Sequence, residues 1–177
     1  VTLVDNASGD YSVYSTTTAT VDGGASGIGD TVYLGGAGDK TIYNLLKNLE
    51  ILASNTGATT VTTVGGGLSI NAAAEAGSVS VDAESLAGAD TLTLSGGADG
   101  NGHAFEVSNL LGLLDASGLN SILSVALSAG AESTVTAGTN ATTVSGSDST
   151  KTVTIDASAM NEGKALVLNN LAAAAVV

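Results

Sequence analysis

Residues 78–94 have the sequence Ser-Val-Ser-Val-Asp-Ala-Glu-Ser-Leu-Ala-Gly-Ala-Asp-Thr-Leu-Thr-Leu. At each end of this stretch a hydroxylated residue alternates with Val or Leu, so the apolar side chains recur at every second position. A period of two predicts a strand with one buried face and one polar face. Residues 82–90 lie between the two alternating segments and contain the Asp, Ser and Gly that are typical of turns. The stretch therefore predicts a strand, a turn and a second strand.

The same alternation recurs along the chain, with Gly-rich segments between its copies. It is clear at 124–127 and 152–155, and weaker at 59–64, 68–70 and 166–168. Strand and turn follow each other roughly every ten residues, and no long helix is predicted. The apolar spacing of residues 44–52 also fits a helical turn, but we favour a turn from Asn44 to Asn48 that leads into a strand at 49–52, because both neighbouring segments are strands.

An imperfect internal repeat accompanies the strands. Each of three segments contains an apolar residue, an Asp and an Ala, followed by a Ser and a second apolar residue; they begin at Val81, Leu114 and Ile155. Their Asp residues, Asp82, Asp115 and Asp156, are separated by 33 and 41 residues. We expect each Asp to turn the chain at a corner by accepting hydrogen bonds from nearby backbone amides, and direct metal binding is the less favoured role.

Repetition of short strands predicts an all-β fold in which parallel coils stack as a β-solenoid (a β-helix or β-roll), because one coil cannot bury its apolar face alone. A β-sandwich of adhesin repeats is the alternative. The chain has no Trp, no Pro and one Phe, which favours the solenoid over a sandwich with an aromatic core. We expect residues 1–177 to form a single solenoid segment of a longer or polymerising chain, with a sub-boundary near 96–104.

The charge of the chain restricts its partners. Seventeen acidic and four basic residues give a formal net charge of -13. So few cations cannot neutralise phosphates or anionic lipid headgroups, which argues against nucleic acid and against the membrane surface as partners. The closing apolar run of residues 171–177 is too short to cross a bilayer, so no membrane insertion is expected. Carboxylates together with Gly and Asn instead suit hard cations such as calcium.

Two Gly-Asp steps occur nine residues apart, in Gly29-Asp30-Thr31-Val32-Tyr33 and Gly38-Asp39-Lys40-Thr41-Ile42-Tyr43. A related segment is Gly96-Gly97-Ala98-Asp99-Gly100-Asn101. At these loops the chain resembles the RTX family of secreted calcium-binding proteins, whose Gly-Asp nonapeptide forms a parallel β-roll with calcium between its turns. The resemblance implies calcium as a cofactor, bound through Asp30, Asp39, Gly36, Gly38, Asp99 and Asn101. The match is partial, because Asp39 comes one position early and Asn101 replaces an Asp.

The remainder of the chain resembles the low-complexity body of RTX-associated surface proteins, including S-layer proteins and type I-secreted adhesins. Leu114–Leu119 and Asn48-Leu49-Glu50 are similar to elements that recur in them. The resemblance implies secretion without a cleaved leader, calcium-triggered folding and location on the bacterial cell surface.

These observations predict a structural extracellular protein that assembles with copies of itself as an S-layer, filament or adhesin stalk. A carbohydrate- or ice-binding module of a large adhesin is the alternative, suggested by Thr-rich strand faces; cell-surface polysaccharide is then the ligand. We expect no enzymatic activity. The single histidine, His103, has no evident partner to orient it, and the chain has no Cys nucleophile and no phosphate-binding loop.

Overall fold

The computed structural model describes residues 10–23, 31–45, 48–52, 54–63, 65–73, 76–86, 88–98, 103–129, 132–146, 151–171 and 175–176. Within these residues all regular elements are short strands, a consequence of the β-branched and hydroxylated composition of the alternating segments. The strands are β1 Tyr11–Tyr14, β2 Ala19–Asp22, β3 Thr31–Gly35, β4 Lys40–Leu45, β5 Asn48–Ile51, β6 Thr59–Thr63, β7 Leu68–Ala72, β8 Val79–Asp82, β9 Thr91–Gly96, β10 Ala104–Leu110, β11 Leu113–Leu119, β12 Ile122–Leu127, β13 Ser133–Thr136, β14 Thr142–Ser145, β15 Val153–Asp156, β16 Leu166–Asn169 and β17 Ala175–Val176.

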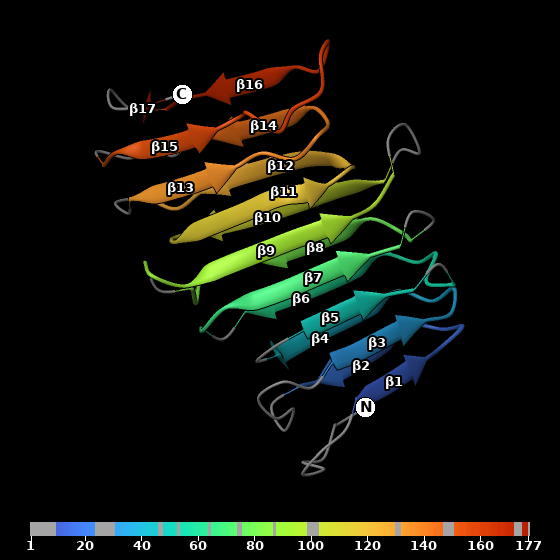
Figure 1. The fold of residues 1–177 in the computed structure, drawn as a ribbon. Coiled ribbons are helices and arrows are strands. Elements are labelled where there is room, and N and C mark those ends of the chain that lie inside the picture. Colours follow the sequence, from blue (N-terminus) through green and yellow to red (C-terminus); the bar gives the residue numbers. More distant parts are fainter. Residues whose placement is uncertain are drawn as a thin grey trace.

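The strands form two parallel sheets. The odd-numbered strands, β1 to β17, make one sheet in sequence order, and the even-numbered strands, β2 to β16, make the other. Each turn of the chain thus contributes one strand to each sheet, and the turns stack from the N-terminal end to the C-terminal end (Figure 1). The predicted parallel β-solenoid is confirmed. The β-sandwich alternative does not occur in the described residues, because every strand pair in them is parallel.

The number of residues in a turn varies, although the strands stay in register. Val32 pairs with Leu49, 17 residues later, whereas Val81 pairs with Val107, 26 residues later. The corners absorb the difference, since loop length can change without disturbing the ladder of backbone hydrogen bonds. This variation explains the irregular spacing of the sequence repeat: Asp82 lies in the even sheet, whereas Asp115 and Asp156 lie two turns apart in the odd sheet.

The core consists of inward-facing columns of side chains that repeat from turn to turn. In the even sheet one column is Val21, Ile42, Val61, Val81, Val107, Val125 and Val144, each at most 1% exposed. In the odd sheet a second column is Leu68, Leu92, Leu114, Val135 and Ile155. Small branched side chains suit this thin core, because the two facing sheets leave room for few large rings. The period-two pattern of the sequence therefore assigns the buried face correctly.

Two bulges in the even sheet redirect the chain toward the interior. In β4 three steps, from Ile42 to Leu45, oppose two steps of β6, and β10 has the same extra residue between Val107 and Leu110. A bulge of one residue bends the strand and changes the direction of the next side chain. As a result Leu45 and Leu110 are buried at the corner. The structure also confirms that residues 44–52 form no helix: β4 ends at Leu45 and β5 begins at Asn48.

Candidate functional site

The first expected calcium loop contains a buried lysine. Lys40 begins β4, and its side chain lies in an inward column between Ala19 and Thr59 of the neighbouring turns. Its side chain is 1% exposed. The ammonium nitrogen Nζ donates to the carbonyl oxygens of Ser15 at 3.1 Å and Gly36 at 3.0 Å, and also to that of Gly38. Two of the residues expected to bind calcium through their carbonyls, Gly36 and Gly38, thus bind the ammonium of Lys40.

Burial lowers the pKa of the Lys40 ammonium, and the neighbouring Asp39 carboxylate opposes that shift. The Asp39 carboxylate itself accepts a hydrogen bond from the backbone N–H of Ala58, one turn further along, at 2.9 Å. Asp39 therefore connects two turns of the solenoid through the backbone. The same corner contains both the cation and the carboxylate that the calcium loop was expected to supply, but each has a partner within the chain.

Glycine is required in this corner because the backbone passes close to the preceding turn. Gly36 has a φ of +88°, in the region that side chains with a Cβ rarely adopt. A Cβ on Gly38 would collide with the carbonyl group of Thr17. The Gly-rich character of the segment is thus accounted for by stacking alone, and it does not by itself indicate a metal ion.

The other expected calcium ligands, Asp30, Asp99 and Asn101, lie outside the described residues. Among the residues that are described, no group of three or more His, Cys, Asp or Glu side chains is placed to hold a metal ion. The donors gathered at the Gly36–Lys40 corner are neutral carbonyl oxygens. They fit a cation, but they lack the free carboxylate that calcium sites in proteins use.

Asp82, Asp115 and Asp156 each bind the backbone two residues ahead. Oδ1 of these residues accepts from the N–H of Glu84 at 3.2 Å, of Ser117 at 3.0 Å and of Ser158 at 2.9 Å, respectively. Hydrogen bonds from the Ser158 side chain and backbone lower the pKa of the Asp156 carboxyl. This is the geometry of an Asx turn, in which the side chain replaces a backbone carbonyl.

Two asparagines connect adjacent turns at the bulges, and the sequence analysis did not single them out for this role. Asn44 and Asn109 have φ values of 57° and 56°. Nδ2 of Asn44 donates to Oδ1 of Asp22 at 3.1 Å, and Nδ2 of Asn109 donates to Oδ1 of Asp82 at 3.1 Å. Each asparagine thus binds the Asp one turn earlier. The signal that could have revealed them is the recurrent sequence apolar-x-Asn-Leu, at 42–45, 107–110 and 168–171.

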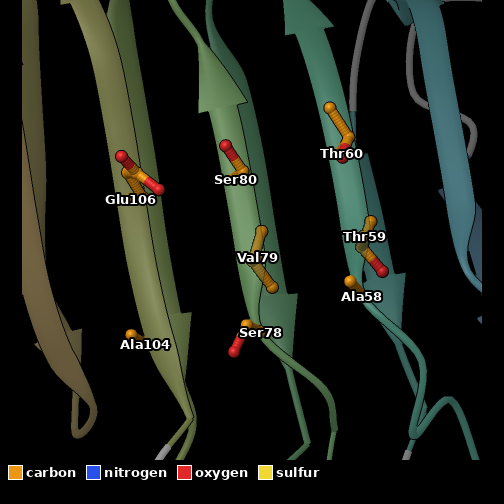
Figure 2. A pocket seen from close by; sticks show the side chains of 8 residues that line it. All are labelled: Ala58, Thr59, Thr60, Ser78, Val79, Ser80, Ala104 and Glu106. Atoms are coloured by element: carbon orange, nitrogen blue, oxygen red, sulfur yellow. The ribbon is translucent and has the colours of Figure 1, made fainter.

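A shallow hollow of about 210 Å³ lies on the outer face of the even sheet, across β6, β8 and β10 (Figure 2). Small side chains form one end of it, since Ala58, Ser78 and Ala104 begin these strands or precede them. The hydroxyl groups of Thr60 and Ser80 and the carboxylate of Glu106 supply its polar atoms (Figure 2).

The hollow belongs to a longer column of hydroxyl groups on the same face. The strand register aligns Thr20, Thr41, Thr60, Ser80, Ser124 and Thr143, with Glu106 between Ser80 and Ser124. Neighbouring parallel strands are about 4.8 Å apart, so the column is evenly spaced even though its members are unevenly spaced in the sequence.

Comparison of the chain with protein-family models, with curated proteins and with solved structures finds no match. The described residues also contain no helix that is both long and apolar enough to span a bilayer.

We predict that Asn109 acts through both its left-handed backbone and its side chain. Replacing Asn109 with Ala should cost about 1–2 kcal/mol of the free energy of unfolding, because the residue must then adopt φ > 0 with a Cβ and without the bond to Asp82. Replacing it with Gly should cost less, because Gly accepts this φ. Urea unfolding followed by circular dichroism measures both.

The matched control is Ser124→Ala on the outer face of β12, which should change the free energy of unfolding by less than about 0.5 kcal/mol. Equal losses for Asn109→Gly and Asn109→Ala would show that the left-handed backbone is not the reason for this asparagine.

Proposed function

We propose that the chain is a structural module of a secreted bacterial surface protein, which assembles with copies of itself as an S-layer, a filament or an adhesin stalk. The observation that carries the proposal is the uninterrupted parallel pairing of two sheets along the stack, in which each turn serves as the template for the next. A solenoid of this kind grows by adding turns, and a second copy adds turns in the same way as further chain does.

The apolar surface of β16 supports assembly at that end of the stack. Leu168 pairs with Val144 of β14, a member of the inward core column, yet it is 38% exposed. Val167 beside it is 43% exposed. Edge strands with unpaired backbone groups and exposed apolar side chains readily pair with another strand. A second copy stacked on β16 would cover both side chains.

The use of the acidic residues also favours a structural role. Carboxylates of Asp10, Asp39 and Asp90 accept backbone N–H groups of Thr31, Ala58 and Gly66, each from another turn. Acidic side chains of the described residues are thus engaged in holding turns together. The proposal includes calcium as a further stabilising ion and the cell surface as the location, both implied by the RTX resemblance.

Assembly should depend on the β16 edge. We expect the unaltered chain to gain mass with concentration in sedimentation velocity, and Leu168→Lys to raise the concentration required by roughly tenfold or more. The reason is that an inward-pointing charge at an edge blocks strand addition. The control, Thr143→Lys, places the same charge on the outer face of β14 and should leave assembly unchanged. A chain that stays monomeric at every concentration would refute self-assembly.

Calcium should stabilise the fold through the loops around Asp30 and Asp99. At a calcium concentration 100 times the dissociation constant, linkage predicts a gain of about 2.7 kcal/mol over the same protein in chelator at equal ionic strength. Asp30→Asn combined with Asp99→Asn should abolish that gain in thermal melting, whereas Asp156→Asn should retain it. An identical melting temperature in calcium and in chelator would remove calcium from the proposal.

The second candidate function is a carbohydrate- or ice-binding module, favoured by the aligned hydroxyl column of the even sheet. Retention on insoluble polysaccharide and thermal hysteresis test the two ligands. Ser80→Leu, which fills the hollow, should abolish polysaccharide binding, whereas Thr143→Leu at the far end of the column should not. For ice, which contacts the whole column, both variants should lose activity. Neither retention nor hysteresis by the unaltered chain would dismiss this candidate.

A further inference from the structure

Lys40 occupies a position that the fold otherwise fills with uncharged side chains. The inward column to which it belongs continues through Thr59, Val79, Phe105 and Leu123. Lysine is almost never fully buried unless its charge is compensated, because transfer of an ammonium group from water is costly. A specific interaction must therefore hold the Lys40 side chain in the interior.

That interaction comes from carbonyl groups of two successive corners. The Ser15 carbonyl lies between β1 and β2, and the Gly36 and Gly38 carbonyls lie one turn later, between β3 and β4. Their positions are set by the stacking itself: Ser15 N–H donates to the Gly35 carbonyl at 3.1 Å, and Gly38 N–H donates to the Ser15 carbonyl at 3.2 Å. The cage is therefore built by the backbone, and the ammonium occupies its centre.

A ring of neutral carbonyl oxygens stabilises a positive charge without a carboxylate. Backbone carbonyls that replace a hydration shell are the ligands of monovalent cations such as potassium, whereas calcium sites also use carboxylate charge. The Asp39 carboxylate next to the cage is engaged by the Ala58 N–H. The chemistry of the cage thus points to a monovalent cation.

We infer that Lys40 is a tethered cation: its ammonium fills a monovalent-cation site formed by the carbonyls of Ser15, Gly36 and Gly38. The lysine keeps the first corners of the solenoid ordered without a free ion. Removal of the side chain to the Cβ should expose the site, which sodium or potassium then occupies together with water. This inference goes beyond the proposed surface role and does not depend on self-assembly or on calcium.

The test compares Lys40→Ala with Lys40→Met and the unaltered chain by thermal melting in potassium, sodium or choline chloride at equal ionic strength. Choline controls for general screening of the net charge, since it is too large for the cage. We expect Lys40→Ala to gain roughly 5 °C in potassium or sodium over choline, saturably. Lys40→Met fills the space without a charge, so it should melt below the unaltered chain in all three salts.

Two results would overturn the inference. One is a Lys40→Ala protein that gains nothing from potassium or sodium over choline, including one that fails to fold in any of the salts. The other is a Lys40→Met protein that melts with the unaltered chain, because the cage would then need no cation. In the unaltered chain, nitrogen-15 NMR should also show one slowly exchanging lysine ammonium signal, absent in Lys40→Met; its absence from the unaltered chain would contradict the cage directly.

Discussion

The parallel pairing of each strand with the strand one turn away is the interaction on which the structure depends. Because the pairing keeps side chains in register, every position of a turn belongs to a column that runs along the stack (Figure 1). An inward column must be apolar or must satisfy its own polar groups, since its members are removed from water. An outward column is free to collect hydroxyl groups. Core, hydroxyl face and edge surface are all consequences of this one constraint.

The corners meet the same constraint with polar side chains. Asn55, buried in the corner before β6, donates from Nδ2 to the Thr59 hydroxyl at 2.9 Å and to the Gly57 carbonyl at 3.4 Å. Lys40 makes the corresponding contact to the Gly38 carbonyl one turn earlier. A neutral amide and an ammonium thus perform the same task in successive corners. Either one satisfies a carbonyl that the tight glycine corner leaves inside the protein.

This use of polar groups bears on how the acidity of the chain is interpreted. A formal net charge of -13 suggests a strong demand for external cations. In the described corners, however, carboxylates such as those of Asp39 and Asp82 bind backbone and asparagine N–H groups of neighbouring turns. The requirement for calcium therefore rests on the loops around Asp30 and Asp99. The acidic character of the rest serves the connection between turns.

The sequence by itself determined the strands, their buried faces and the stacking class, because alternation such as Thr91-Leu92-Thr93-Leu94 depends only on local geometry. It did not determine which turns are neighbours, because corner length varies and pairs Val32 with Leu49 but Val81 with Val107. For that reason the evenly spaced hydroxyl column and the Asn109–Asp82 contact were not apparent from residue spacing. Only the tertiary structure decided that Lys40 faces inward, since Gly-Asp-Lys is equally compatible with a solvated loop. The cage around its ammonium exists because two distant corners stack, and contacts between distant corners leave no local pattern in the chain.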